Sequence, residues 1–250
     1  MPSTARLQID EIRAEGRKVI GTMITSTDPA VTTIAGSVGF DFVIIDMEHG
    51  PLTIETAQRH VLAARSQSMM VFVRVLENRP QLIQSVMDIG ADAIIAPKTE
   101  TPEDAAALAR AVRYGPGGRG ACPGVLSADY QFAGWDEFRQ TSNANVLAIP
   151  LIETARGVAN AAAIAAVDGV DAVFFGPVDY AQDTGVDYLG PQVQAAAISV
   201  TDATRDAGKL RFAAQFHAED AEIIVDNADL MLLRQSFQTI LAGHAEGRTA

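Results

Sequence analysis

Three titratable side chains that could perform acid–base chemistry lie in the segment at residues 40–51 (FDFVIIDMEHGP), just after its apolar part. The β-branched centre of this segment is typical of a strand buried on both faces, and it ends in Asp46, Glu48 and His49. A carboxylate near an imidazole suits general acid–base catalysis, because it fixes the tautomer of the ring. The same acids could instead cap the helix that we expect to begin near Thr53.

Further charged residues lie within or just after other apolar segments. Arg74 lies inside the β-branched sequence VFVRV, so it is expected to be buried and to need an anionic partner, in a functional site or a structural ion pair. Glu153 directly follows one apolar segment (IPLIETARG), and Asp179 lies just after another (VFFGPVDY). Either acid could simply favour a helix first turn. Together they offer the oxygen ligands that Mg2+ or Mn2+ prefers.

Other chemistries have less support in the sequence. His and Cys residues do not cluster with the spacing of a zinc site. Cys122 has no obvious base beside it, which argues against a nucleophile. His60 and His244 are expected at the surface.

Eight apolar, strand-like segments alternate with helical, often alanine-rich segments, without a break in composition. This order predicts an α/β protein, namely one (β/α)8 barrel domain over residues 1–250, with a doubly wound open sheet as the alternative. No internal repeat is apparent. Residues 114–145 are long for a connection and form a candidate active-site loop. The expected strands are residues 19–25, 42–46, 70–75, 93–97, 146–152, 172–176, 210–216 and 230–234.

In such a barrel, side chains at or just beyond the ends of the strands share the carboxyl-terminal rim. The rim predicted here combines carboxylates, histidines and cations, a mixture that could bind a metal ion and an anionic substrate. Its residues are Asp46, Glu48, His49, Arg74, Lys98, Glu153, Asp179, Gln215, His217 and Arg234.

Composition bounds the class of protein. With 250 residues, of which 48% are hydrophobic, the chain can bury a large core. Its net charge of −12 is spread without long runs, which argues against a nucleic-acid partner. No apolar run is long enough to span a membrane, and the amino terminus lacks the apolar core of a signal sequence. With Cys122 as the single cysteine, these features predict a soluble, cytoplasmic protein without a membrane partner.

Several motifs of this chain, taken in order, resemble the HpcH/HpaI aldolases, metal-dependent (class II) pyruvate aldolases that include 4-hydroxy-2-oxoheptanedioate aldolase and 2-dehydro-3-deoxyglucarate aldolase. The resemblance covers about residues 21–236. Its motifs are Asp-x-Glu-His after the second strand, VRV in the third, GADAIIAPKTETPEDA, RYGPGGRG, Ile-Glu-Thr after the fifth strand, and GVDAVFFGPVDY with its trailing Gly185. Each motif is weak alone, but their order and spacing are specific.

The resemblance implies an aldolase that reversibly cleaves a 4-hydroxy-2-oxo acid into pyruvate and an aldehyde through a pyruvate enolate. It implies a divalent metal ion, Mg2+ or Mn2+ with Co2+ as a further option, and a homo-oligomer, typically a hexamer, whose last helix packs on a neighbouring subunit. The implied roles are metal binding by Glu153 and Asp179, enolate stabilisation by Arg74, proton transfer by His49 held by Asp46, and pyruvate binding by Arg74 and the backbone at Gly176, Pro177 and Val178.

The chain departs from the pattern of this family at three places. Leu151 stands where glutamine is common, Tyr180-Ala181 replaces Leu-Ser after the metal aspartate, and Gln235-Ser236 falls where a Gly-x-Asp-like stretch is usual. These departures leave the natural aldehyde open.

They also leave room for a family member that decarboxylates oxaloacetate. Two other enzyme hypotheses stand beside the main one, namely a CoA-ester lyase of the citrate lyase β type and a Schiff-base (class I) aldolase using Lys98. A phosphate-binding sugar isomerase is disfavoured because the segments after strands seven and eight lack glycine. A non-catalytic binding protein on the same scaffold is the remaining alternative.

Overall fold

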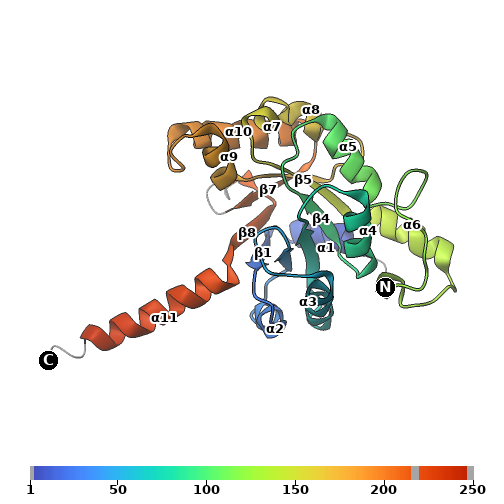
Figure 1. The fold of residues 1–250 in the computed structure, drawn as a ribbon, viewed down its shortest axis with the longest axis horizontal. Coiled ribbons are helices and arrows are strands. Elements are labelled where there is room, and N and C mark those ends of the chain that lie inside the picture. The colour runs from blue at the N-terminus through green and yellow to red at the C-terminus, as the bar shows by residue number, and fades with distance from the viewer. Residues whose placement is uncertain (1–2, 215–219, 247–250) are drawn as a thin grey trace.

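Eight parallel strands close into a barrel in the computed structural model, which describes residues 3–214 and 220–246 (Figure 1). The strands pair in chain order, and β1 also pairs with β8, which closes the sheet and confirms the (β/α)8 prediction over the open sheet. They are β1 (Val19–Ile24), β2 (Phe42–Asp46), β3 (Met70–Arg74), β4 (Ala93–Ala96), β5 (Leu147–Ile152), β6 (Ala172–Phe175), β7 (Leu210–Ala214) and β8 (Ile223–Ala228).

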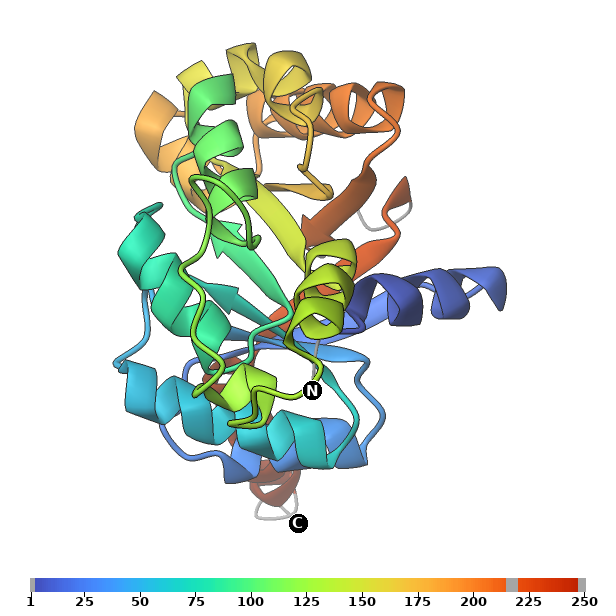
Figure 2. The same cartoon turned by 90° about the vertical axis from the view of Figure 1, so that its right-hand side faces the viewer.

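Helices surround the strands, as the view in Figure 2 shows. None of the helices in the described part of the chain is long and apolar enough to cross a membrane. The helical elements are α1 (Ala5–Ala14), α2 (Ala30–Ser37), α3 (Ile54–Ser66), α4 (Pro80–Asp88), α5 (Pro102–Ala111), the 3-10 turn η1 (Leu126–Ala128), α6 (Trp135–Asn145), α7 (Ala155–Ala159), α8 (Ala161–Ala165), α9 (Pro177–Thr184), α10 (Pro191–Asp206) and α11 (Asp229–Glu246).

The core has two layers because successive side chains of a strand alternate between the inside and the outside of the barrel. Inside, the ring of Phe42 stacks on Phe72 with centroids 4.5 Å apart, and Phe212 meets both rings edge-on. Ile9 of α1 is fully buried in the same cluster, so α1 is packed against the barrel interior.

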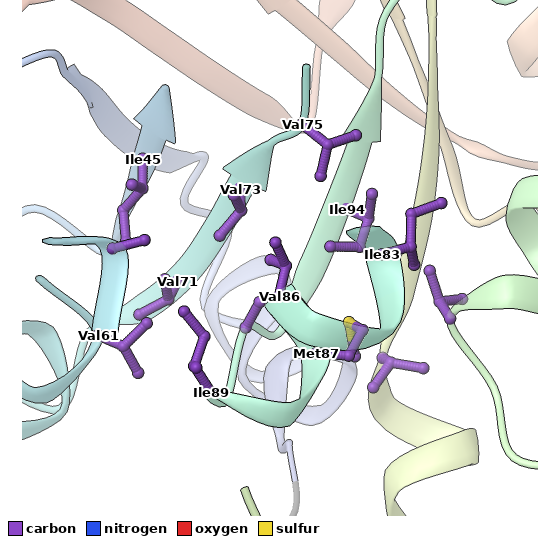
Figure 3. Packing of buried hydrophobic residues seen from close by; sticks show 14 of the residues in the cluster. Ile45, Val61, Val71, Val73, Val75, Ile83, Val86, Met87, Ile89 and Ile94 are labelled. Carbon is purple, nitrogen blue, oxygen red and sulfur yellow. The ribbon is translucent and has the colours of Figure 1, made fainter. Parts of the chain in front are cut away.

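The outer layer consists of aliphatic side chains between the strands and their helices. Figure 3 shows part of this layer, which includes Ile45, Val71, Val73 and Ile94 from strands and Val61, Ile83, Val86 and Met87 from α3 and α4.

A repeated hydrogen bond at the amino-terminal end of the barrel ties the strands together in pairs. A carboxylate just before each even-numbered strand accepts the N–H of the second residue of the preceding odd-numbered strand, at 2.7 to 2.9 Å. The pairs are Asp41 with Ile20, Asp92 with Val71, Asp171 with Ala148, and Glu222 with Arg211. This structural repeat was not apparent in the sequence, because only one acid recurs for every two strands and the residues around it differ.

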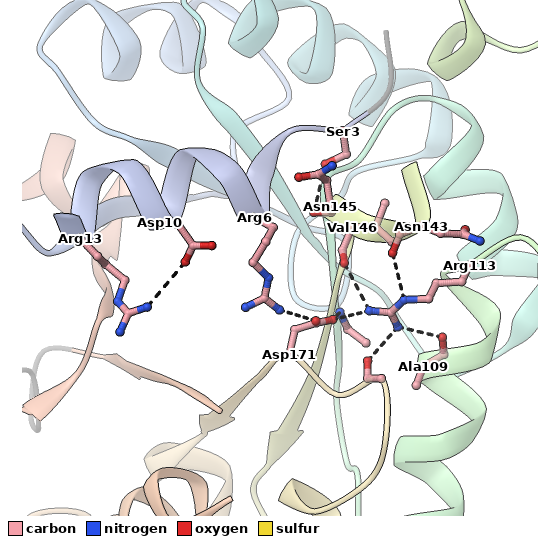
Figure 4. Close-up of polar contacts among 12 residues, drawn as sticks. Ser3, Arg6, Asp10, Arg13, Ala109, Arg113, Asn143, Asn145, Val146 and Asp171 are labelled. Atoms are coloured by element: carbon pink, nitrogen blue, oxygen red, sulfur yellow. Dashed lines mark hydrogen bonds and ion pairs between the residues drawn. The ribbon is translucent and has the colours of Figure 1, made fainter. Parts of the chain in front are cut away.

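Asp171 also joins this end of the barrel to its helices, as Figure 4 shows. Its carboxylate accepts from Nη2 of Arg113 at 2.8 Å and from Arg6 of α1. Arg113 further donates to the carbonyls of Gly169 and Ala109. Arg113, the first arginine of the RYGPGGRG motif, is therefore explained by packing at the end of the barrel opposite to the carboxyl-terminal rim.

The last strand differs from the prediction. We expected a strand at residues 230–234, but these residues lie in α11, and β8 runs over Ile223–Ala228, where we expected a helix. Ile223 and Val225 fill the barrel interior, and the acids flanking this short run hid it from the sequence pattern. Arg234 is therefore exposed on α11 and is not a rim residue, while Gln215 and His217 lie outside the described residues.

One further expectation, that of His60 at the surface, is corrected by the structure. His60 is fully buried rather than at the surface, and its Nδ1 lies 2.7 Å from the hydroxyl of Thr32. Residues 114–145 connect α5 to the start of β5, and Arg119 there pairs with Asp88 of α4 at 2.7 Å. This contact lies toward the amino-terminal end of the barrel, and a role of residues 114–145 as an active-site loop stays a prediction.

Candidate active site

A buried ion pair between Asp46 and Arg74 anchors the rim. The two residues are register partners at the ends of β2 and β3. Arg74 donates from Nε to Oδ1 at 2.9 Å and from Nη2 to Oδ2 at 2.7 Å, a two-bond geometry that fixes the plane of the guanidinium. Asp46 is 1% exposed and Arg74 8%. The charge of Arg74 is thereby held rigidly at the mouth of the barrel.

The imidazole of His49 does not contact Asp46, which corrects the expectation that this acid holds it. Oδ1 of Asp46 instead accepts the backbone N–H groups of Glu48 and His49, at 3.1 and 3.4 Å. The side chain of His49 is half exposed, and its Nε2 lies 3.7 Å from Oε2 of Glu48. Asp46 therefore shapes the turn that carries His49, while Glu48 is the acid beside the ring.

Glu48 was predicted at the rim, but the family resemblance assigned it no role. Its Oε2 lies 3.3 Å from Nε of Arg74 but is buried and has no hydrogen-bond partner among the described residues. Burial, which outweighs the attraction of Arg74, raises the pKa of Glu48 above its ordinary value.

Glu153 is the most buried acid of the rim apart from Asp46, with 1% of its surface exposed. Its Oε1 accepts the backbone N–H of Lys98 at 2.7 Å, whereas its Oε2 is buried without a hydrogen-bond partner in the described part of the chain. Burial, together with the negative charges of Glu48 and Asp179, raises the pKa of Glu153 to about 7. Such an oxygen requires either a proton or a cation.

The segment after β6 contributes Asp179 and backbone donors. Pro177 has no N–H, and the N–H of Gly176 donates to the carbonyl of Ile152 at 2.9 Å. We had expected the backbone N–H of Gly176 to bind pyruvate, but this N–H already donates to Ile152 and is not free. The N–H groups of Val178 and Asp179 lie in the first turn of α9, where backbone donors lack partners within the helix and favour anions.

Gly176 instead makes room for the carboxylate of Glu153. A Cβ at this position would lie 2.9 Å from Oε2 and 3.0 Å from Cβ of Glu153. It would also lie 3.2 Å from Cδ1 of Leu151, which is buried in the barrel interior. Tyr180 packs its ring on Phe175, with centroids 5.5 Å apart, so its bulk is taken up by the outer core.

The charges of this site fit a divalent cation. Arg74 is already paired with Asp46, which leaves Glu48, Glu153 and Asp179 as acids that repel one another. Oε2 of Glu153, buried without a hydrogen-bond partner among the described residues, is the observation that tests the fit, and Oε2 of Glu48 likewise accepts no hydrogen bond there although it lies within ion-pair distance of Arg74. Within the described ranges, no three His, Cys, Asp or Glu side chains form a complete metal cluster. The arrangement thus suits a few carboxylate ligands completed by water and substrate.

Lys98 is less suited to Schiff-base chemistry. Its side chain is exposed. A nucleophilic lysine must be desolvated or lie near other cations. The neighbours of Lys98 at this rim are acids such as Glu153, and the exposed side chain is not desolvated.

Comparison with known proteins identifies the class of this barrel. The family model of HpcH/HpaI aldolase/citrate lyase matches residues 20–232, so the chain belongs to that family, as the sequence motifs predicted.

Individual relatives agree with this assignment. The chain is 34% identical over 220 residues to the hydroxypyruvate/pyruvate aldolase of Delftia acidovorans (strain DSM 14801 / SPH-1), covering 83% of this chain and 81% of that protein. It is 30% identical over 245 residues to the 4-hydroxy-2-oxovalerate aldolase of Rhodococcus jostii (strain RHA1), covering 93% and 94%. The crystal structure of a family protein from Burkholderia cenocepacia J2315 matches with a TM-score of 0.87 at 28% identity, covering 96% and 99%. These matches confirm the prediction of an aldolase-type carbon–carbon lyase.

Proposed function

We propose that this protein is a divalent-metal-dependent aldolase that reversibly cleaves a 4-hydroxy-2-oxo acid into pyruvate and an aldehyde. The observation that carries the proposal is Oε2 of Glu153, which is buried without a hydrogen-bond partner among the described residues, near an arginine held by Asp46. A buried carboxylate oxygen that accepts no hydrogen bond is suited to binding a cation. The arginine fixed by Asp46 is suited to binding an anionic oxygen of the substrate. The names of the relatives, pyruvate and 4-hydroxy-2-oxo acid aldolases, support the same class of substrate.

In this proposal Glu153 and Asp179 hold the metal ion. Their donors are all oxygen, which favours a hard cation such as Mg2+ or Mn2+, with Co2+ as a further option. When bound, the ion supplies Lewis-acid polarisation of the oxygens of pyruvate.

The residues around this position have distinct roles in the proposed reaction. Arg74, immobilised by Asp46, stabilises the negative charge that develops on the keto oxygen when the methyl group of pyruvate loses a proton. The N–H groups of Val178 and Asp179 at the start of α9 bind the carboxylate of pyruvate.

His49 is the proposed group that removes the methyl proton and returns it in the reverse direction. Its half-exposed ring can accept a proton from a substrate in the mouth of the barrel, and its Nε2 lies 3.7 Å from Oε2 of Glu48. The enolate then attacks the aldehyde.

A homo-oligomer, with a hexamer as the expected order, is part of the proposal. α11 extends away from the barrel in Figure 1 and exposes apolar side chains such as Phe237, Ile240 and Leu241. At its base, a cavity of about 250 Å³ lined by apolar residues of α2 and α11, including Ile34, Val38 and Leu233, offers a complementary surface. An exposed apolar helix of this kind is typical of an interface. Sedimentation of the wild type and of a Phe237→Asp, Leu241→Asp variant tests this: a wild-type monomer would contradict it.

A cytoplasmic location also remains a proposal. It rests on the single cysteine, Cys122, which is free in the structure.

Release of pyruvate tests the proposed activity directly. A panel of 4-hydroxy-2-oxo acids is incubated with the enzyme and Mg2+ or Mn2+, and pyruvate is followed by NADH oxidation with lactate dehydrogenase. We expect turnover of at least one substrate, loss of turnover with EDTA, and loss in Glu153→Gln. Turnover of oxaloacetate or CoA esters alone would contradict the aldolase assignment in favour of a decarboxylase or CoA-ester lyase.

A further inference from the structure

The turn that follows β4 holds a strained residue directly beside the proposed metal ligand Glu153. Lys98 has a φ of +50°, in the left-handed region that residues other than glycine, asparagine and aspartate rarely adopt. Pro97 precedes it, and a proline followed by a residue with positive φ is the sequence of a type II turn, in which glycine is usual at the second of these positions. A lysine here needs the surrounding structure to hold it.

The next residue supplies that hold. Thr99 is 1% exposed, its hydroxyl donates to the carbonyl of Ala96 at 3.0 Å, and its N–H donates to the carbonyl of Leu151 at 3.1 Å. Gly157 closes against it, because a Cβ there would lie 2.9 Å from the carbonyl oxygen of Thr99. The turn is thus fixed to β4, β5 and the start of α7.

The conformation of this turn determines the direction in which the backbone N–H of Lys98 points. With Lys98 in the left-handed region, its N–H donates to Oε1 of Glu153 at 2.7 Å. Oε2 then lies buried without a hydrogen-bond partner among the described residues, so close to Gly176 that a Cβ there would lie 2.9 Å from it. A turn with Lys98 at negative φ would point its N–H elsewhere and free the carboxylate to rotate.

We infer that Lys98 is a positioning residue, whose left-handed backbone orients Glu153 so that Oε2 is presented to the divalent cation. The inference rests on the proposed metal site, and it assigns the role to the backbone of Lys98, not to its ammonium group. The preference of residue 98 for positive φ therefore sets the affinity for the metal ion.

A series of substitutions at this position separates backbone from charge. Lys98→Gly and Lys98→Asn tolerate positive φ, Lys98→Met removes only the charge, and Lys98→Val disfavours positive φ through its β-branch. Mn2+ binding is measured by the electron paramagnetic resonance signal of the free ion. We expect Gly, Asn and Met variants to bind within about threefold of wild type and the Val variant to bind about tenfold more weakly.

Ser68→Val is the matched control, because Ser68 also has positive φ, of 57°, but is exposed before β3, at the opposite end of the barrel. We expect this variant to keep wild-type Mn2+ affinity, which separates local strain from loss of the site.

Hydrogen exchange of the Lys98 amide keeps the inference testable if Lys98→Val does not fold. Glu153→Gln retains an acceptor for this amide and should preserve its protection, whereas Glu153→Ala should increase its exchange rate about tenfold or more. Wild-type Mn2+ affinity in Lys98→Val, or equal exchange of the Lys98 amide in both Glu153 variants, would refute the role of Lys98 but not the metal site. Weak binding in Lys98→Met would transfer the role to the charge. A wild type that binds no Mn2+ would refute the metal site and this inference together.

Discussion

Replacing Glu153 with glutamine should stabilise the metal-free protein while abolishing its response to metal. The substitution keeps the shape of the side chain and an oxygen that can accept the N–H of Lys98. It removes the charge that burial and the nearby acids Glu48 and Asp179 disfavour. Opposite effects on stability and on metal binding are the signature of a residue retained for function.

The size of the stability gain follows from the pKa of Glu153. This value rises from 4.5 to about 7 on folding, so the folded state binds the proton more tightly than the unfolded state. The ionised carboxylate therefore destabilises the fold. The effect is absent below pH 4.5, grows as the pH rises, and is complete above about pH 7. At about 1.4 kcal/mol for each pH unit of that interval, the gain in Glu153→Gln reaches about 3 kcal/mol.

Urea unfolding of EDTA-treated protein at pH 5 and pH 8 measures this gain. We expect the difference between Glu153→Gln and wild type to be small at pH 5 and close to its full value at pH 8. Added Mn2+ should raise the unfolding midpoint of wild type but not of the variant. Glu11→Gln, at an exposed acid on α1, is the control and should leave both quantities unchanged. A variant that is less stable than wild type at pH 8, or that is still stabilised by Mn2+, would refute this explanation of Glu153.

Three further substitutions test other parts of the site. Arg74→Lys keeps the charge but loses the two-bond geometry with Asp46, so kcat for pyruvate release should fall by about 100-fold; a wild-type kcat would reduce Arg74 to a structural role. His49→Ala should slow hydrogen exchange of the pyruvate methyl group by about 100-fold in NMR, and an unchanged rate would place the base elsewhere. Gly176→Ala adds a Cβ 2.9 Å from Oε2 of Glu153, so Mn2+ affinity should fall about tenfold with little change in urea unfolding. Wild-type affinity in that variant would show that this contact is easily relieved.

The sequence predicted the first seven strands well because they are short, continuous apolar runs with clear boundaries. Parallel strands buried on both faces produce such runs, and β2 at Phe42–Asp46 has the predicted bounds. β8 was missed because its apolar residues are few and lie between acids. The apolar residues of α11 are more numerous but lie outside the barrel core, so a pattern based on hydrophobicity favoured the wrong segment.

The positions of the site residues followed from the strand ends, but their partners did not. We paired His49 with Asp46 because they are neighbours in the sequence, whereas strand register places Asp46 opposite Arg74. Strand periodicity could have revealed this pair. Phe42 and Ile44 face inward and Asp46 continues their series, as Arg74 continues that of Met70 and Phe72. The strained turn at Lys98 has no such signal, because lysine is unusual at positive φ.

Exchange of the methyl protons of pyruvate in D2O is the most direct test of the central claim that this site forms a pyruvate enolate with a divalent metal. The loss of the methyl signal is followed by NMR with wild-type enzyme, first with Mg2+ or Mn2+ and then with EDTA. The account predicts exchange with the metal ion and none with EDTA, whatever the natural aldehyde is. Exchange that persists in EDTA would contradict the role of the metal ion and point to Lys98, and no exchange under either condition would contradict the enolate itself.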